Sequence, residues 1–550
     1  MLPLHNPAIC LARVGVYCRV ARTGVIIAKS SGKSRGFEKI FEILKKEKKR
    51  RKSNKTEGKR LDFLIHIVYN ETVFPSAALK DGGGAREKID SATQNVRIHY
   101  DQIVKQKVGF TLFSMFFGAG NLIFPPQLGA QAGTATWPAM AGLAISAVGL
   151  PILAVIAVVR AGSLDKLASR VHPVFSLVFT ILIYLSIGPC LAIPRTASTS
   201  FEMAVPPFLP EGASTTLLQL GYSAVFFAAA FLVALRPEKL TSRLGKVLCP
   251  TLLVLVTVIF LGCLVHPLGG YGAVQAPYDH AAPVQGFLTG YQTMDAIAGL
   301  NFGIVIVLNI KALGLQETKS VERATVRAGV VAAVLFLVMY SMLAHVGAVS
   351  GGAFPGTTNG AVTLTNLVRA IFGAPGSVLL AAVFIIACFN TCVGLISCCS
   401  SYFNTLIPKI PVPAWAAFFA LVSMFIANAG LDQILAISVP VLNMLYPAAI
   451  VLIVLAFLPA PVQRLKGIYP WGIAFVGVAS VAYEVRSLGQ TIPALDRVLS
   501  RIPLSGAVDH LLEQIPLAGV GLGWVLPAVV GILLGAVISL MAGQKDQVEK

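Results

Sequence analysis

VGFTLFSMFFGAGNLIFPPQLG, residues 108–129, is the stretch that decides the fold of this chain. A helix of roughly 20 apolar residues crosses a hydrocarbon core about 30 Å thick, and this stretch has that length and character. Its middle, GAGN at 118–121, consists of small and polar residues. Irregular backbone inside a membrane is tolerated only where it lines a cavity or is buried in protein. We therefore expect this helix to be interrupted at 118–121.

A second apolar stretch also has small and polar residues near its middle. GYQTMDAIAGLNFGIVIVLNIK, residues 290–311, carries Gly299, Asn301 and Gly303 near its middle. Either stretch alone would also fit ordinary helix packing through small residues. Together they predict a pair of interrupted membrane helices, the second of them broken at 299–303.

The whole chain has the composition of an integral membrane protein. Of its 550 residues, 55% are hydrophobic and 13% are charged, with a mean hydropathy of +0.75, whereas a soluble domain carries about 25% charged residues. Apolar runs between charged or Pro/Gly-rich breaks predict an all-α polytopic membrane protein with 12 transmembrane helices. The predicted spans are 107–131, 135–160, 173–194, 216–235, 245–267, 288–312, 326–349, 375–404, 413–429, 432–458, 469–487 and 519–542.

The loop charges support this count and give an orientation. Counted along the sequence after residue 100, 18 Lys and Arg residues fall on one side of the predicted membrane and 5 on the other. Cytoplasmic loops carry the excess of positive charge, so we expect both termini in the cytoplasm. Because the basic residues are spread over short loops, the pI of about 9.6 indicates membrane orientation and no nucleic-acid partner.

The two interrupted helices are the first and the sixth, and they run in opposite directions. This order is typical of two inverted five-helix repeats with a substrate site where the broken helices meet. We therefore expect a transporter domain at 105–545. Its inverted repeats are expected at about 107–267 and 288–458, followed by two extra helices at about 469–542.

Residues 1–104 differ from the rest of the chain. The first 100 residues hold 21 of the 44 Lys and Arg and 9 of the 25 Asp and Glu, and residues 45–60 form a charge run without an apolar face. We expect a basic, disordered extension and assign it no function. Three interpretations are a cytoplasmic arm that touches anionic lipid, a targeting segment, and a translation start placed too far upstream. The abrupt onset of the membrane pattern favours the third.

The breaks suggest how a substrate is held. An unwound helix exposes amide N–H groups at the start of its second half and carbonyls at the end of its first half. The amides attract a carboxylate, and the carbonyls attract an ammonium or a small cation. Backbone dipoles can therefore hold a zwitterionic amino acid. Asp295 and His345 are the main ionisable groups at membrane depth, which makes them functional candidates for gating or local pairing.

Four motifs resemble the bacterial branched-chain amino acid:cation symporters of the BrnQ type. They are FFGAGNLIFPPQLG at 116–129, IGPCLAIPRTASTSFE at 187–202, LNFGIVIVLNIKALG at 300–314 and CVGLISCCSSYF at 392–403. The resemblance covers about residues 105–545, in order. It implies a LeuT-like 5+5 inverted repeat of the amino acid–polyamine–cation superfamily. It also implies a protein of the bacterial inner membrane that imports leucine, isoleucine and valine with a cation.

The resemblance and the breaks together imply a substrate site. The carboxylate is expected at the amides of the first break, and the ammonium at carbonyls near Ala298 and Gly299. The expected substrate-binding residues are Phe117, Gly118, Ala119, Gly120, Asn121, Ala298, Gly299, Leu300, Asn301 and Phe302, of which Phe117, Leu300 and Phe302 would face the aliphatic side chain. Asp295, Arg195 and Tyr184 are expected to gate or support the site.

Sodium is the expected coupling ion, and no cofactor is expected. Hard cations take oxygen ligands, and in LeuT-like folds a cation lies between the first and eighth helices. The expected ligands are Phe116 and Ala119 carbonyls with the hydroxyls of Thr391 and Ser397, although a hydroxyl in a membrane helix also bonds readily to its own i−4 carbonyl. The fifth span has no charge, which favours sodium, while Lys246 at its cytoplasmic entrance keeps a proton as the alternative.

Alternative functions fall into two classes. One alternative is a proton-coupled symporter or exchanger of another neutral amino acid. An enzyme or a channel is a further class, but the sequence has no GxxxxGK[ST], no HExxH and no paired carboxylates on one helix. The cysteines at 388–399 lie in an apolar segment without histidine, which indicates packing rather than metal binding. Apart from the lipid bilayer, no obligate partner is expected.

Overall fold

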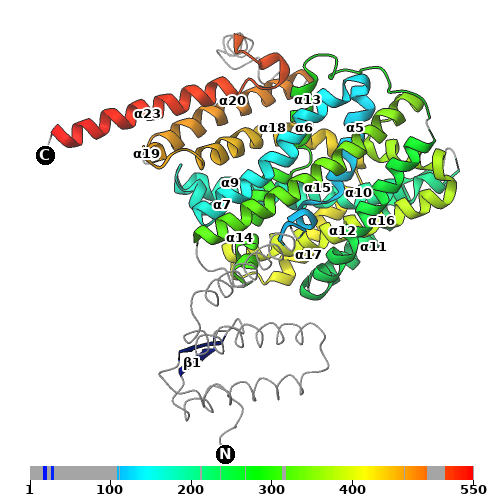
Figure 1. Cartoon of the computed structure of the whole chain (residues 1–550), viewed down its shortest axis with the longest axis horizontal. Helices are drawn as coiled ribbons and strands as arrows, with labels where there is room; N and C mark the ends of the chain where they lie inside the picture. Colours follow the sequence, from blue (N-terminus) through cyan, green and yellow to red (C-terminus); the bar gives the residue numbers. More distant parts are fainter. Residues whose placement is uncertain are drawn as a thin grey trace, which may run out of the picture. The chain divides into compact units, whose positions relative to one another are not determined.

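The computed structural model describes residues 17–20, 26–29, 108–110, 112–210, 214–235, 237–266, 268–312, 318–463, 465–491 and 514–548. The chain divides into two compact units. One comprises residues 1–104 with 312–314, and the other comprises 105–311 with 315–550. Figure 1 traces the elements along the sequence.

The described part of the first unit is a small antiparallel sheet. It consists of β1 (Tyr17–Val20) and β2 (Ile26–Lys29), and its register pairs Tyr17 with Lys29 and Val20 with Ile26. The rest of the predicted N-terminal extension, including the charge run at 45–60, lies outside the described residues.

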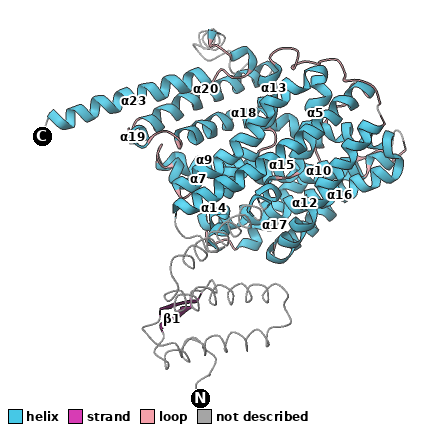
Figure 2. Ribbon diagram, viewed as in Figure 1, coloured by secondary structure: helices cyan, strands magenta, loops and turns pink. Residues whose placement is uncertain are grey.

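The described secondary structure of the second unit is helical (Figure 2). Residues 108–110 and 112–116 form the first helical segment. The helices that follow in the first half are α5 (Ala119–Ala132), α6 (Thr136–Ala144), α7 (Leu150–Ala161), α8 (Leu164–Ala168), α9 (Pro173–Leu185), α10 (Ala192–Ala204), α11 (Thr216–Ala234) and α12 (Pro237–Val265). Those of the second half are α13 (Ala282–Tyr291), α14 (Asp295–Ala312), α15 (Thr318–Ala353), α16 (Gly360–Leu406), α17 (Val412–Ala427), α18 (Leu431–Leu455), α19 (Ala460–Gln463), α20 (Ile468–Thr491) and α23 (Val525–Val548).

These helices are those of a multi-pass membrane protein. Among the described residues, 7 helical stretches are long and apolar enough to cross a membrane. Three shorter apolar helices, Pro250–Val265, Val412–Ala427 and Val525–Met541, coincide with the predicted fifth, ninth and twelfth spans. The predicted sixth span corresponds to α13 and α14, which are separated by a break.

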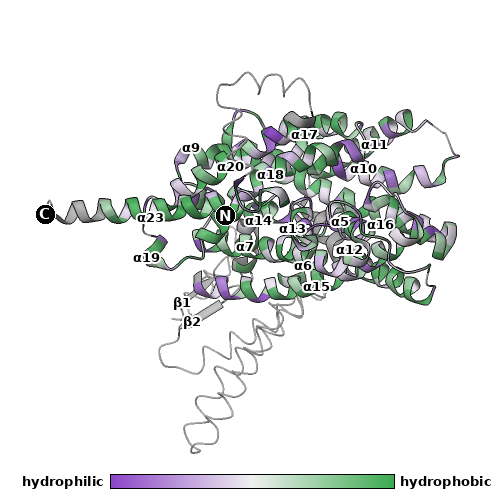
Figure 3. Cartoon of the chain, turned by 90° about the horizontal axis from the view of Figure 1, so that it is seen from above, coloured by the Kyte–Doolittle hydropathy of each residue, from purple (hydrophilic) through white to green (hydrophobic). Residues whose placement is uncertain are grey.

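The outward faces of the helices are strongly apolar. Val225 of α11 is 72% exposed and Phe425 of α17 is 71% exposed, and Figure 3 shows hydrophobic residues along α20 and α23. Soluble proteins rarely expose contiguous apolar surface on this scale, whereas helices in contact with lipid do. The exposed apolar side chains are therefore the lipid-facing surface.

Small residues allow α5 and α15 to approach backbone to backbone. A Cβ atom on Gly129 would overlap the carbonyl oxygen of Ala344, and one on Gly347 would overlap that of Pro126. Such close approach is the usual basis of helix association in membranes, where burial from water contributes little. This contact holds the second half of the first span against the seventh.

The third span is bent in its middle. A π-helical turn at Ser186–Cys190 separates α9 from α10, and Gly188 within it has non-helical dihedrals. Pro189 has no amide hydrogen, so the helical hydrogen-bond ladder fails at this point. The bend precedes Arg195, which lies in the first turn of α10 and is buried.

Candidate functional site

The first span is interrupted at Phe117 and Gly118. The helix at 112–116 ends there, and Gly118 has extended backbone dihedrals, φ −125° and ψ −166°, directly before α5. The predicted break at 118–121 is confirmed at its first residue, whereas residues 119–121 form the first turn of α5. The amide of Gly118 donates a hydrogen bond to Asn121 Oδ1 at 3.0 Å, so the side chain of Asn121 stabilises the break.

The sixth span is also interrupted, at a different place from the one predicted. α13 ends at Tyr291, residues 292–294 form a turn, and α14 begins at Asp295. Met294 in this turn has a φ of 63°, in the left-handed region. The prediction of a break at 299–303 is wrong, because these residues lie inside α14.

Packing explains the glycines that prompted that prediction. A Cβ atom on Gly299 would lie 2.8 Å from the carbonyl oxygen of Pro151, and one on Gly303 would lie 2.7 Å from Val158 Cβ. Both glycines thus let α14 approach α7, which is the ordinary role of small residues in membrane helices. Carbonyls near Ala298 are engaged by the helical ladder, so they do not provide the free acceptors expected for an ammonium.

The two breaks lie next to each other, and polar side chains join them. Asn121 Nδ2 donates to Asp295 Oδ2 at 2.5 Å and to Tyr340 Oη at 2.5 Å. Tyr340 of α15 donates in turn to Asp295 Oδ2 at 3.4 Å. Asp295 is only 4% exposed. The sequence suggested a role for Asp295, and the structure gives it two neutral partners from two other spans.

Arg195 also lies at this junction. Its Nη1 donates to the carbonyl oxygen of Gln292 at 2.7 Å, and its guanidinium carbon lies 5.3 Å from the ring centroid of Phe124. A Cβ atom on Gly120 would lie 2.8 Å from Arg195 Nη2 and 3.4 Å from Thr293 Cα. Glycine at position 120 therefore leaves the space that the guanidinium occupies between the two breaks.

The candidate sodium ligands are divided between two places. A Cβ atom on Gly118 would lie 3.2 Å from Thr391 Oγ1 and 3.8 Å from Phe116 O, so Thr391 and the Phe116 carbonyl flank the first break. Thr391 also donates to Ala387 O at 3.1 Å, the i−4 bond common in membrane helices. Ser397 instead donates to Ala234 O of α11 at 3.0 Å. Ala119 begins α5 beside the break.

The predicted aliphatic lining is packed mostly with other aromatic rings. Phe117 stacks on Phe113 with centroids 4.9 Å apart, and Phe116 lies 6.1 Å from Phe302. Leu300 is buried in the main hydrophobic core. These contacts make the surroundings of the first break largely apolar.

Tyr184 and Asn301 lie in other surroundings. The ring of Tyr184 stacks on Tyr402 at 3.8 Å, which joins α9 to α16. Asn301 is buried, and neither its side-chain oxygen nor its nitrogen has a hydrogen-bond partner among the described residues. The structure thus brings Asp295 and Arg195 to the junction of the breaks, whereas Tyr184 stabilises a contact between the third and eighth spans.

Sequence reasoning missed Gln292, Thr293 and Tyr340. The available signal was QTMD at 292–295, since Thr and Asp often begin a helix. Tyr340 lies within an apolar run, and nothing along the sequence marks it as a partner of Asp295.

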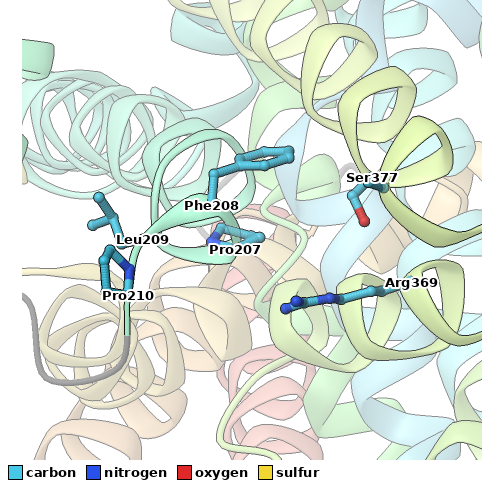
Figure 4. Close-up of a pocket in the computed structure, with 7 residues that line it drawn as sticks. Pro207, Phe208, Leu209, Pro210, Arg369 and Ser377 are labelled. Atoms are coloured by element: carbon cyan, nitrogen blue, oxygen red, sulfur yellow. The ribbon is translucent and has the colours of Figure 1, made fainter.

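A cavity of about 320 Å³ lies away from the breaks. The turn at 207–210 and α16 near the bend at Gly373 line it, and Figure 4 shows the side chain of Arg369 extending from α16 toward this turn. Another cavity, of about 340 Å³, includes Glu202 and Asp432. Within the described part of the chain, no cluster of three or more His, Cys, Asp or Glu side chains could hold a metal.

Comparison with known structures concerns the fold. Mhp1, a nucleobase-cation-symport-1 family transporter in a closed conformation with bromovinylhydantoin bound, superposes with a TM-score of 0.52 and 14% identity, over 80% of this chain and 92% of that chain. The inward-facing conformation of Mhp1 gives 0.51 and 13%, over 80% and 91%. The helical architecture is therefore that of a membrane transporter fold.

Comparison with sequences gives the family. The family model described as branched-chain amino acid transport protein matches residues 102–542. The branched-chain amino acid permease BraB of Bacillus subtilis (strain 168) is 38% identical over 445 residues, which cover 80% of this chain and 97% of BraB. The branched-chain amino acid transport system 2 carrier protein of Pseudomonas aeruginosa is 38% identical over 438 residues, covering 80% and 96%. These relatives are transporters rather than enzymes, and the chain belongs to the branched-chain amino acid transport protein family.

Proposed function

We propose that this protein imports leucine, isoleucine and valine together with sodium, by alternating access, across the bacterial inner membrane. It would do so with 12 spans, a 5+5 inverted repeat with two extra helices, and both termini in the cytoplasm. Membership of the family supports transport of branched-chain amino acids. The loop charges support the orientation.

The observation that carries the proposal is the contact between Asn121 and Asp295 across the two breaks. Two opposed helices that are interrupted at one depth, and joined there, form the usual substrate site of inverted-repeat transporters. The amides of Ala119 and Gly120, in the first turn of α5, supply a positive end for a substrate carboxylate.

An aliphatic side chain would enter the apolar region around Phe117, Leu300 and Phe302. A hydrophobic pocket discriminates one methylene by only about 1–3 kcal/mol. Leucine, isoleucine and valine would therefore share one carrier with modest differences in affinity.

The coupling ion is proposed to bind at the first break, between the Phe116 carbonyl and the Thr391 hydroxyl. Both oxygens flank the same point beside Gly118, and oxygen is the ligand of hard cations. A proton remains the alternative ion. Lys246, which prompted that alternative, has a side chain that lies outside the described residues. Moving one charge through 100 mV contributes about 2.3 kcal/mol, enough for about 40-fold accumulation.

The test is leucine uptake by the purified protein in proteoliposomes, with an inward sodium gradient or with choline, in the presence of a proton ionophore. Uptake is expected with sodium only. Thr391→Ala is expected to raise the sodium concentration for half-maximal uptake about tenfold. This factor corresponds to a loss of about 1.4 kcal/mol of binding free energy when one oxygen ligand is removed.

Two further variants on the same helix serve for comparison. Ser401→Ala, which removes a hydroxyl bonded to Ser397 O, is the matched control. Ser397→Ala is expected to have a smaller effect than Thr391→Ala. Uptake that depends on a proton gradient and ignores sodium would overturn the sodium proposal, and no uptake of leucine, isoleucine or valine would overturn the function itself.

A further inference from the structure

Arg195 is a buried cation whose hydrogen-bonding capacity is only partly used. It is 4% exposed, and within the described part of the chain its Nε has no hydrogen-bond partner. Among the described residues, no carboxylate oxygen lies within 4.0 Å of its guanidinium. Burying a charge is costly unless it is paired and hydrogen-bonded. The position of Arg195 therefore favours an anion that is bound during only part of the cycle.

Gln292 carries a buried hydrogen-bond acceptor that no described residue uses, next to the unused donor of Arg195. Its side chain is buried, and its Oε1 accepts no hydrogen bond from any residue that the structure describes. Its backbone carbonyl is the acceptor for Arg195 Nη1. Arg195 thus carries an unpaired donor and Gln292 an unpaired acceptor among the described residues, and the two residues are in contact at the break of the sixth span. A ligand with one negative and one positive end would satisfy both.

The surroundings match these two ends. The guanidinium lies beside Gly120, in the first turn of α5, where the helix dipole also favours negative charge. Asp295, at the start of α14, lies within electrostatic reach of Arg195 but forms no ion pair with it. Its side-chain hydrogen bonds come from the neutral groups of Asn121, Tyr340 and Thr293. Among the described residues, Asp295 therefore has neutral hydrogen-bond partners but no ion-pair partner within 4.0 Å.

We propose that Arg195 binds the carboxylate of the transported amino acid, and that Asp295 and the side-chain oxygen of Gln292 bind its ammonium group. The proposal rests on the proposed amino-acid transport and deepens it. Charged side chains from the third and sixth spans recognise the zwitterion. They replace the backbone carbonyls near Ala298, which lie inside a continuous helix.

The test uses two leucine analogues that each lack one charged end. Leucinamide has no carboxylate, and 4-methylpentanoate has no ammonium. Each analogue competes with labelled leucine for uptake by the full-length protein in proteoliposomes. The wild-type protein is expected to prefer leucine over either analogue by about 10- to 100-fold, the factor for a hydrogen bond to a charged group.

The variants should separate the two ends of the substrate. Arg195→Gln is expected to abolish the preference over leucinamide while the preference over 4-methylpentanoate persists. Asp295→Asn is expected to show the reverse pattern. Arg369→Gln, an exposed arginine at the outlying cavity, is the matched control and should keep both preferences.

A purely structural role for Arg195 would weaken both preferences together, and that outcome would overturn the proposal, as would unchanged preferences in both variants. If Arg195→Gln does not fold, Arg195→Lys decides, because it keeps the charge and loses the two-pronged donor geometry. It should reduce the preference over leucinamide at least about threefold, and an unchanged ratio would refute the proposal. Failure of the wild-type protein to take up leucine would instead mean that the proposed function is wrong.

Discussion

Asn121→Ala is the perturbation that most directly tests the junction of the two broken helices. Asn121 accepts from the Gly118 amide at 3.0 Å and donates at 2.5 Å to both Asp295 and Tyr340. Losing a hydrogen bond to a charged acceptor costs about 1.5–3 kcal/mol, and losing a neutral one costs about 0.5–1.5 kcal/mol. The substitution is therefore expected to destabilise the folded protein by about 2.5–6 kcal/mol.

The assay is thermal unfolding of the purified protein in detergent, paired with leucine uptake in proteoliposomes. The matched control is Asn428→Ala. Asn428, at the end of α17, donates from Nδ2 at 3.0 Å to Ser223 Oγ and at 2.6 Å to Met424 O, and its Oδ1 accepts from Ser223 Oγ at 3.2 Å. These three neutral hydrogen bonds should cost about 1.5–4.5 kcal/mol when lost. Asn121→Ala should unfold at a lower temperature than the control and lose at least about tenfold in uptake.

Asn121→Asp extends the same experiment. It keeps the size of the side chain but places a second carboxylate beside Asp295, and like charges at a buried site repel. We expect a larger loss of uptake than for Asn121→Ala when both are measured at neutral pH. If both variants melt like the wild-type protein and transport leucine at its rate, the two breaks are not joined through Asn121.

Two further predictions concern packing and pH. Gly303→Val should impair folding, because even a Cβ there would lie 2.7 Å from Val158 Cβ. Gly394→Ala is the control and should be tolerated, because a Cβ added there would meet no neighbouring atom within 4 Å. The yield of monodisperse protein in size-exclusion chromatography measures both. Burial raises the pKa of Tyr278, in the loop before α13, to about 12, although its hydrogen bond with Thr289 partly opposes this shift. Its contribution to stability should be complete below pH 10 and decline as the pH rises toward 12, since the unfolded chain ionises first. The difference in stability between the wild-type protein and Tyr278→Phe should therefore shrink across that window when both are unfolded at alkaline pH, and a constant difference would contradict the prediction.

The sequence by itself determined the membrane class of this protein, the approximate helices and the break in the first span. These are local properties, because a run of apolar residues in lipid forms a helix, and the small and polar residues of GAGN mark a weak point in that run, where Gly118 is extended. The same local logic misplaced the sixth break. Gly299 and Gly303 look like helix breakers along the chain, and only their contact with α7 identifies them as packing residues.

Tertiary structure alone decided which polar groups meet. The partners of Asp295 come from Asn121, 174 residues away, and from Tyr340, 45 residues away, and Arg195 reaches Gln292 from the third span. Hydrogen-bond partners at such separations depend on how helices pack, and helix packing depends on side-chain shape rather than on periodicity. Composition and pattern can therefore locate a broken membrane helix. Which charged side chains lie at the break depends on how the helices pack in the tertiary structure.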